Sequence, residues 1–124
     1  VMSVVDDEQL SEIPSMSSDE LDELDFGAVK VDDEGSVLEY NQYESEMAGV
    51  DPSDAKGNNF FKEVAPCTNN KLFYGQFQDG VEAGELDEEM DYTFTYKMDP
   101  TNVKIRLYHD QDSETNWVFV KKKD

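Results

Sequence analysis

The chain has 124 residues, of which 37% are hydrophobic and 11% aromatic, so it can bury one core and is expected to form one compact unit. Its 30 acidic and 10 basic residues give a formal charge of −20, which opposes binding to nucleic acid and to acidic membrane surfaces. No apolar run approaches the roughly 18 residues that span a bilayer, and the first residues lack the pattern of a signal peptide. We therefore expect a soluble, cytoplasmic protein.

The acidity also bears on the conditions in which the chain folds. Like charges repel one another across a compact molecule, and dissolved salt screens that repulsion. A salt-rich cytoplasm would remove this cost, so the composition favours a halophilic source. The alternative is an acidic and very soluble protein from ordinary conditions.

Residues 1–25 form a distinct segment, rich in Ser, Asp and Glu, with Leu10 and Ile13 at one spacing and Leu21 and Leu24 at another. Ser18 precedes the sequence DELDEL, and its hydroxyl is expected to cap a short helix there. Pro14 separates this helix from any earlier helical turn. This segment is expected to lie as a thin cap on a domain formed by residues 26–124.

The domain is predicted to begin with two strands, Phe26–Val31 and Ser36–Asn41, joined by a turn that ends on Gly35. A short helix follows, with Asn41 as its N-cap and Gly49 as its stop. Further helical turns are predicted at residues 51–57 and 58–64. A longer helix follows them, because Phe73, Phe77 and Val81 recur every four residues and would form its buried stripe.

The last third of the chain has the alternation of strands. Apolar and polar side chains alternate from Met90 to Met98 and again from Val103 to Leu107. A polar loop over residues 109–116 leads to a last strand at Trp117–Val120. The pattern predicts an α+β fold in which short helices flank a five-stranded antiparallel sheet.

Cys67, in the stretch FFKEVAPCTNN, is the only cysteine and so cannot form an internal disulfide. It is an idle core thiol, a handle for an intermolecular bond, or a reactive group. A catalytic cysteine needs a base, normally histidine. The only histidine, His109, is predicted to be a surface residue next to Asp110 at the end of a strand, so a hydrolase is disfavoured and no enzymatic activity is expected.

Other chemistries lack their motifs. The sequence has no glycine loop for phosphate and no paired His or Cys spacing for zinc. The acidic clusters lack the glycine and closing glutamate of a calcium loop. We interpret them as solvated surface.

Tyr40 and Glu44 form a second candidate pair. Tyr40 ends a predicted strand and Glu44 lies four residues later in a short helix, so the two side chains can face the same volume. A buried carboxyl keeps its proton and can donate a hydrogen bond, as a tyrosine does. From spacing alone, the favoured interpretation of Glu44 is one more surface acid.

With these residues, the sequence closely resembles the photoactive yellow proteins, a family of small bacterial blue-light receptors of the PAS fold. The resemblance covers nearly the whole chain, without gaps from Phe26 to Met98, and residues 1–25 match only loosely. The residues that carry it are FGAV (26–29), EYN (39–41), Glu44, DP (51–52), GNNFFKEVAPCT (57–68), FYGQF (73–77), YTFTYKM (92–98) and WVFVK (117–121).

The resemblance implies that Cys67 carries p-coumaric acid as a thioester and that its backbone N–H holds the thioester carbonyl. It implies that Tyr40 and a protonated Glu44 donate hydrogen bonds to the phenolate oxygen. On illumination the double bond would isomerise from trans to cis, Glu44 would give up its proton, and the cap would be released as the signalling state. The implied pocket residues are Val29, Ala48, Val50, Phe60, Val64, Ala65, Pro66, Phe94, Tyr96 and Met98, of which Met98 would hasten dark recovery.

Two positions depart from the best-known family members. Ala48 stands where they have a threonine that bonds to the tyrosine, and Val50 stands where they have an arginine over the chromophore. The first departure removes a hydrogen bond from Tyr40, and the second leaves Tyr40 and Glu44 more of the task of stabilising the phenolate. Neither touches the attachment chemistry.

Two other functions compete with the photoreceptor. One is a PAS-type small-ligand or protein-interaction module without a chromophore. The other is a thiol redox sensor at Cys67, which is weakly supported because Lys62 and Lys71, at a distance, are the only flanking cations. For the photoreceptor, the implied partner is an unidentified downstream signalling protein, and the chain is expected to be a monomer.

Overall fold

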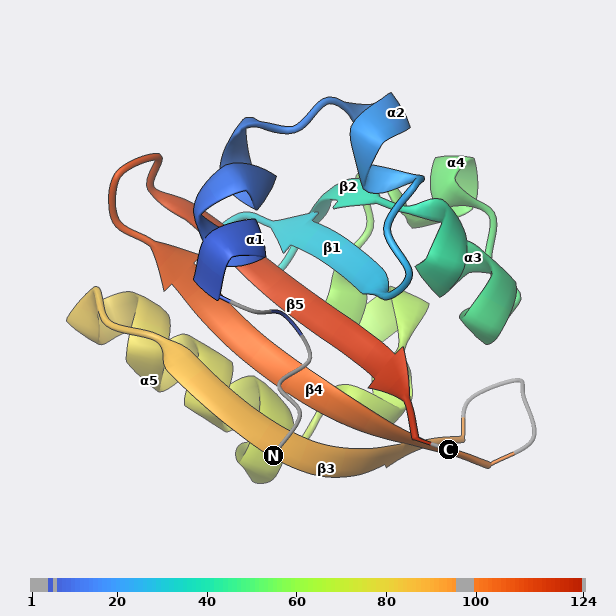
Figure 1. Cartoon of the computed structure of the whole chain (residues 1–124). Helices are drawn as coiled ribbons and strands as arrows, with labels where there is room; N and C mark the ends of the chain where they lie inside the picture. Colours follow the sequence, from blue (N-terminus) through green and yellow to red (C-terminus); the bar gives the residue numbers. More distant parts are fainter. Residues whose placement is uncertain (1–4, 6, 96–99, 124) are drawn as a thin grey trace.

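The computed structural model describes residues 5, 7–95 and 100–123. Five strands form one antiparallel sheet, which confirms the α+β prediction (Figure 1). The sheet order is β2-β1-β5-β4-β3, so the first and last strands of the chain are neighbours at its centre. The strands are β1 (Gly27–Val31), β2 (Val37–Tyr40), β3 (Asp87–Phe94), β4 (Thr101–Asp110) and β5 (Thr115–Lys122).

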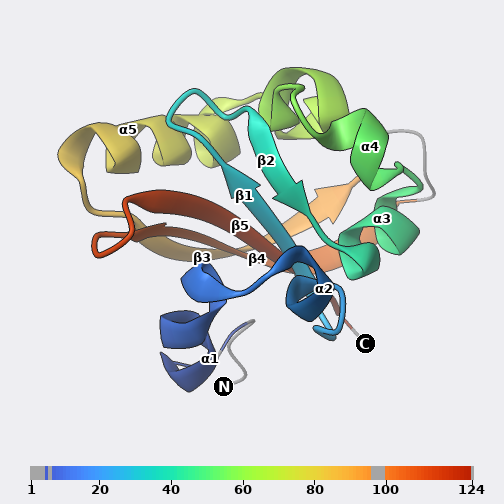
Figure 2. The ribbon, with the colours of Figure 1, turned by 90° about the horizontal axis from the view of Figure 1, so that it is seen from above.

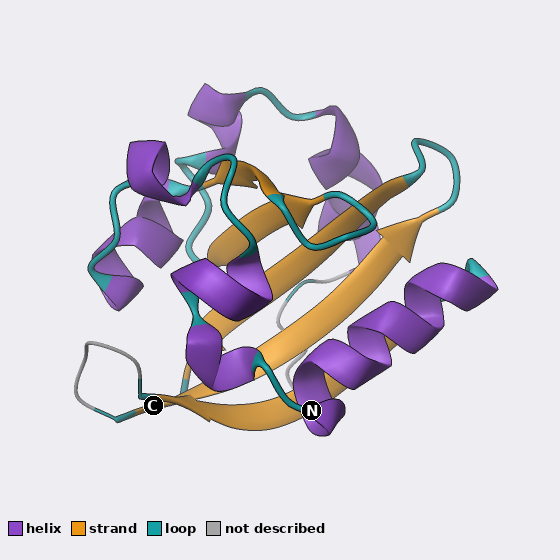
Figure 3. Ribbon diagram, turned by 180° about the vertical axis from the view of Figure 1, so that it is seen from behind, coloured by secondary structure: helices purple, strands orange, loops and turns teal. Residues whose placement is uncertain are grey.

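Helices cover both faces of the sheet (Figures 2 and 3). One face carries the N-terminal helices α1 (Asp7–Glu12), η1 (Ile13–Ser15) and α2 (Ser18–Leu21). The opposite face carries the remaining helices, α3 to α5, with the short π and 3-10 turns between them (Figure 2). These are α3 (Gln42–Ala48), α4 (Pro52–Ala55), η2 (Phe60–Val64), η3 (Pro66–Thr68), η4 (Lys71–Gly75) and α5 (Gln76–Ala83).

Two hydrophobic clusters follow from this layering. The larger one lies between the sheet and the helices α3 to α5, and it includes the predicted stripe residues Phe73 and Phe77, with Val81 half-buried at its edge. The smaller cluster lies under the cap, where Leu10, Ile13 and Leu21 pack against Trp117 and Phe119 of β5. Because β5 is covered on both faces, every residue from Trp117 to Val120 is buried, as their uninterrupted apolar sequence suggests.

Three local predictions need correction. The N-cap of α2 is Ser17, not Ser18: Ser17 has an extended backbone and forms a capping box with Glu20. Ser18 lies inside the helix, and its hydroxyl donates to the Glu39 carboxylate of β2, 2.7 Å away. The polar loop before β5 is shorter than predicted, because β4 runs on to Asp110 and β5 begins at Thr115.

The third correction concerns His109. This side chain is half-buried rather than a plain surface residue, since its Nδ1 lies 2.6 Å from Oδ1 of the buried Asn116. The two residues pair across β4 and β5. The pairing holds the imidazole against the sheet. His109 and Cys67 line different hollows of the protein.

Candidate functional site

Tyr40 and Glu44 reach the core through the junction of β2 and α3. Asn41 lies between them and is the N-cap of α3, as predicted; its Oδ1 accepts from the backbone N–H of Glu44 at 3.3 Å. The same oxygen accepts from the N–H of Ala28 in β1 at 2.9 Å. Asn41 therefore fixes the first turn of α3 against β1 and aims Glu44 into the protein interior.

Both side chains are buried, and each has one polar atom without a hydrogen-bond partner in the described chain. Tyr40 is 4% exposed and Glu44 is 1% exposed, so the interpretation of Glu44 as a surface acid is wrong. Among the described residues, neither the Tyr40 hydroxyl nor Oε1 of Glu44 has a hydrogen-bond partner. A buried polar atom without a partner costs roughly 1–3 kcal/mol. Such atoms are rare in folded proteins, and two in one place point to a group that is bound there.

The surroundings keep both groups protonated. Burial raises the pKa of Glu44 to about 8, so its carboxyl is mostly neutral at pH 7. Burial, and second the neighbouring Glu44, raise the pKa of Tyr40 well above its usual value. The site therefore offers two neutral O–H donors, one from β2 and one from α3.

Cys67 lies in η3, between the turns η2 and η4 that lead into α5. Pro66 begins this 3-10 turn, and the thiol-bearing residue is half-buried. The Cys67 carbonyl accepts hydrogen bonds from the Tyr92 hydroxyl of β3 and from Nδ2 of Asn70, the latter at 3.2 Å. The backbone of Cys67 is thus held by a strand on one side and by the following turn on the other.

Tyr40, Glu44 and Cys67 line one hollow on the side of the sheet that carries α3 to α5. About 300 Å³ lies between its atoms, including the open space at its mouth, yet only about 10 Å³ can take the centre of a water molecule, so the hollow is narrow. Its other walls are apolar, which leaves the two donors as the polar end. These walls are Ala48, Val50, Val64, Ala65 and Phe94.

The remaining predicted pocket residues fall into two groups. Val29 and Phe60 are fully buried in the core next to this hollow but are not among its lining residues, and Pro66 adjoins Cys67. Tyr96 and Met98 lie outside the described residues. Their roles remain predictions from the resemblance.

Two residues of the site, Glu44 and Cys67, have three neighbours that the sequence pattern did not single out. Gly27 in β1 lies against the carboxyl of Glu44, and Tyr92 and Asn70 hold the Cys67 carbonyl. The sequence carried one weak signal, a glycine within a strand, which often marks a close approach. The contacts of Tyr92 with Cys67 and with Asn70 span 25 and 22 residues, so no local pattern predicts them.

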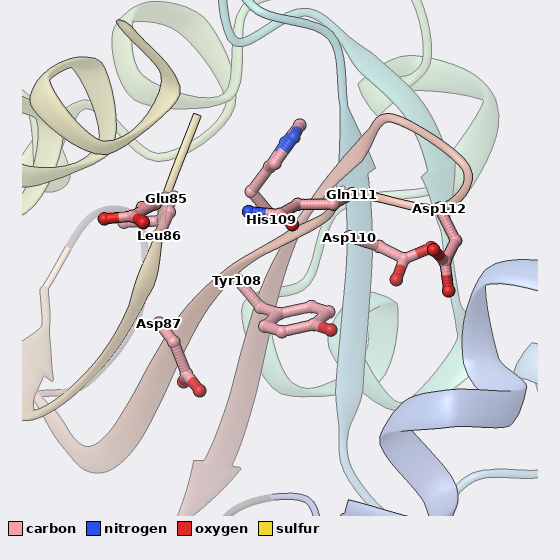
Figure 4. A pocket seen from close by; sticks show the side chains of 8 residues that line it. All are labelled: Glu85, Leu86, Asp87, Tyr108, His109, Asp110, Gln111 and Asp112. Atoms are coloured by element: carbon pink, nitrogen blue, oxygen red, sulfur yellow. The ribbon is translucent and has the colours of Figure 1, made fainter. Parts of the chain in front are cut away.

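A much wider hollow lies elsewhere, at the end of β3 and β4 near His109, where about 360 Å³ can take the centre of a water molecule, against about 10 Å³ beside Cys67. It is lined by Glu85, Leu86, Asp87, Tyr108, His109, Asp110, Gln111 and Asp112, as Figure 4 shows. Most of its polar groups are carboxylates, and it holds no thiol. Within residues 5, 7–95 and 100–123, no group of three or more His, Cys, Asp or Glu could hold a metal ion. In the same residues no helix is long and apolar enough to cross a membrane.

Comparison with known proteins identifies the fold first. The family model of the PAS fold matches residues 18–120. The chain is 41% identical to the photoactive yellow protein of Rhodothalassium salexigens over 107 residues, which are 86% of each chain. It is also 41% identical to that of Halochromatium salexigens over 110 residues, 89% of this chain and 88% of the relative.

A solved structure agrees with these relatives. The photoactive yellow protein domain of the sensor histidine kinase Ppr from Rhodospirillum centenum superposes with a TM-score of 0.85 at 42% identity, over 90% of this chain and 98% of that domain. The sheet, its flanking helices and the family-model match define a PAS sensor domain. The chain belongs to the photoactive yellow protein family.

Proposed function

We propose that this protein is a blue-light receptor that carries p-coumaric acid as a thioester on Cys67. The observation that carries the proposal is the pair of buried, unpartnered polar groups on Tyr40 and Glu44 in the hollow that Cys67 lines. A phenol oxygen between these groups would complete their hydrogen bonding. The apolar walls between the two ends suit an aromatic ring.

The residues present fit this chromophore at both ends. The Cys67 sulfur bonds to the acyl carbon of an activated p-coumaroyl donor, whose leaving group departs, and the thiol proton passes to water. A buried phenolate is costly unless hydrogen bonds meet its charge. The neutral Tyr40 and Glu44 supply those bonds without adding a second charge to the site.

When bound, the acyl group supplies blue-light absorption and a trans-to-cis isomerisation that makes its phenolate a stronger base. Glu44 is the proton donor, because it is the buried acid of the hollow and holds its proton at neutral pH. Loss of that proton leaves a carboxylate with no cation among the described residues that line the hollow. A charge in such a place destabilises the folded arrangement by several kcal/mol in effective terms.

Asn41 provides a route from Glu44 to the cap. Its Nδ2 donates to the carbonyl oxygens of Leu21 at 2.9 Å and of Phe26 at 3.0 Å, while its Oδ1 caps the helix that bears Glu44. A shift of α3 that follows the new charge would therefore weaken the hold on Leu21. We propose that residues 1–25 act as a releasable cap on the domain of residues 26–124. Order-to-disorder of a segment is a known switching device.

The response is proposed to pass to a separate signalling protein, and this function assigns the chain no enzymatic reaction. The matched domain from Rhodospirillum centenum is part of a sensor histidine kinase, which supports a role in signalling. The freed cap and the sheet face beneath it are the parts of this chain that change on release. Trp117 and Phe119 lie on that face.

Reconstitution tests the proposal directly. Incubation of the purified protein with an activated p-coumaroyl ester should raise its mass by one acyl group, colour it yellow and make the colour bleach reversibly in blue light. Hydroxylamine should remove the group, since it cleaves thioesters. A thiol that stays free and titratable after this treatment would overturn the photoreceptor proposal and leave a PAS module without a chromophore.

A further inference from the structure

Both peptide units that flank Cys67 are held by hydrogen bonds. The carbonyl of Pro66, before it, accepts from the N–H of Asn69 at 3.1 Å. The carbonyl of Cys67 itself accepts from the Tyr92 hydroxyl and from Nδ2 of Asn70. The N–H of Thr68, at the other end of that second unit, donates to Ala65 at 2.9 Å. With both units fixed, the direction of the Cα–Cβ bond of Cys67 is fixed as well.

Asn70 organises this arrangement with both ends of its amide. Its Nδ2 also donates to the Tyr92 hydroxyl at 2.7 Å, so the two donors to the Cys67 carbonyl are bonded to each other. Its Oδ1 accepts from the N–H of Phe73 at 2.9 Å and caps η4. We call Tyr92 and Asn70 together the Cys67 clamp.

The clamp is built on the rigid part of the core. The Tyr92 ring meets Phe73 edge-on, with 5.1 Å between centroids, and meets Phe94 in the same way at 6.0 Å. Phe73 and Phe94 are buried, and Phe94 also walls the hollow. Burial raises the pKa of Tyr92, so its hydroxyl stays a donor near neutral pH. The opposite end of the hollow differs, because Tyr40 and Glu44 each have a polar atom without a partner in the described chain.

We propose that Tyr92 and Asn70 are positioning residues that fix the sulfur end of the bound acyl group to the core. The inference rests on the proposed function, since it concerns the same site. It assigns a role to two residues that contact neither the phenol end nor the thiol itself.

Because the chain has a single cysteine, an isotope label on cysteine reports on the clamp alone. Incorporation of cysteine labelled with carbon-13 at its carbonyl marks only the Cys67 backbone carbonyl. In the apoprotein, Tyr92→Phe and Asn70→Asp should each shift the labelled infrared band to higher wavenumber, because the carbonyl loses a donor. Asn70→Asp keeps an oxygen for the Phe73 N–H, so the cap of η4 survives. Tyr74→Phe is the matched control, since Tyr74 stacks on Phe61 in the same aromatic cluster at 4.5 Å.

The acylated protein tests the role. In the wild type and in Tyr74→Phe, the labelled band should be missing from the early light-minus-dark spectrum, because the carbonyl stays fixed. In Tyr92→Phe and Asn70→Asp it should appear as a light-induced shift. A labelled band at the wild-type position in both apoprotein variants would overturn the clamp. A light-induced shift in the wild type as large as in the variants would overturn its role.

Failure of the proposed function would be detected by a different measurement, the mass and the free thiol of the wild type. If the wild type takes up no acyl group, its mass and free thiol are unchanged, and the positioning role falls together with the photoreceptor. If the wild type is acylated and bleaches in light, but neither substitution shifts the labelled band, the photoreceptor proposal is supported and the clamp is contradicted.

Discussion

The carboxyl of Glu44 lies directly over Gly27. A Cβ atom added to Gly27 would come within 2.2 Å of Oε1 of Glu44, a distance that real side chains do not adopt. The glycine in β1 is therefore what lets the acid from α3 lie flat against the sheet. The Oε1 atom that needs this space is the one without a partner in the described chain.

Gly27→Ala should displace the Glu44 carboxyl and destabilise the fold. Overpacking of this kind costs about 1–3 kcal/mol, and a carboxyl pushed towards water loses part of the burial that raises its pKa. Denaturant unfolding measures the first effect, and an infrared titration of the protonated carboxyl in carbon-13 glutamate-labelled protein measures the second.

Gly75→Ala is the control for that substitution. Gly75 has φ −61° at the start of α5, and an added Cβ would meet the Lys71 Cβ at 3.7 Å, an ordinary contact. Its replacement should leave stability unchanged or raise it slightly. If Gly27→Ala proved as neutral as Gly75→Ala, the carboxyl would not be seated on Gly27.

The buried acid gives the stability of the apoprotein a pH dependence of definite sign. Glu44 has its pKa raised from the ordinary 4.5 to about 8. Between these values the unfolded chain has lost the proton and the folded protein keeps it. Folding stability therefore falls as pH rises through this window, by about 1.4 kcal/mol per pH unit from this one group, and is level above about pH 8.

Glu44→Gln isolates this contribution from those of the other acids. The amide does not titrate, so the variant should show a shallower decline of unfolding free energy from pH 5 to pH 8 than the wild type. Glu46→Gln is the control, because Glu46 lies exposed on the same helix and should leave the slope as it is. Equal slopes for all three proteins would place the titrating group elsewhere.

The same substitution has a second effect once the chromophore is attached. Glu44→Gln should shift the dark absorption to longer wavelength, because an amide is a weaker donor to the phenolate than a carboxylic acid. It should also remove the loss of a protonated carboxyl from the infrared difference spectrum, since the amide has no such proton to give. A carboxyl signal that persists in the variant would identify another acid as the proton donor.

Arg106 fastens the start of the cap to the sheet. It is the single arginine of the chain, its side chain is only 8% exposed, and it bonds to both Asp87 oxygens at 2.8 and 2.9 Å and to the carbonyl of Val5 at 2.9 Å. Arg106→Gln should lower the free energy of unfolding by about 1–3 kcal/mol. Hydrogen bonds to charged groups contribute up to this much, and the half-exposure of Asp87 reduces the contribution of that pair.

Limited proteolysis in the dark measures this fastening. Cleavage within residues 1–25 should be several-fold faster in Arg106→Gln than in the wild type. Lys123→Gln is the control, because Lys123 pairs with Asp91 at 3.3 Å on β3 and both side chains are largely exposed. Equal cleavage rates in the three proteins would show that the cap is held by its apolar contacts alone.

The sequence predicts the sheet well because the burial of a strand sets its pattern of apolar residues, which is continuous when both faces are covered and alternating when one face is exposed. Trp117–Val120 has no polar interruption, and both faces of β5 are covered. The alternation predicted from Met90 appears on β3, where Met90 and Tyr92 are half-buried, Phe94 is buried and the residues between them are exposed. The helix of Asn41 and Gly49 was predictable because both ends carry their own signals: Asn41 caps the first turn and Gly49 has φ 73°.

The site was less predictable because its chemistry depends on tertiary surroundings. Spacing places Glu44 near Tyr40, but thirty acids make any one of them look like surface, and only burial by the fold distinguishes Glu44. The resemblance to the family supplied that residue and Cys67. It did not supply Asn70, whose clamp contact depends on how β3 lies beside η3 and η4.

The acidic surface predicts a response to salt. The chain carries a formal charge of −20, and residues 1–25 hold many acids and neither lysine nor arginine. Folding brings these charges together, and docking the cap adds its acids to a domain that is itself acidic, so repulsion opposes both steps. In the described part of the cap, Arg106 donates to the carbonyl of Val5, and Nζ of Lys121 lies 3.7 Å from the Asp25 carboxylate.

Raising potassium chloride from low to molar concentration should therefore raise the melting temperature and speed dark recovery of the acylated protein. Molar salt shortens the screening length to about 3 Å, which removes most repulsion between exposed groups and favours the docked cap. Sucrose at matched osmolality is the control, since an excluded solute favours burial without screening charge. If sucrose reproduces the effect of the salt, exclusion explains it. If neither quantity responds to potassium chloride, the charges are too well solvated for their repulsion to control docking.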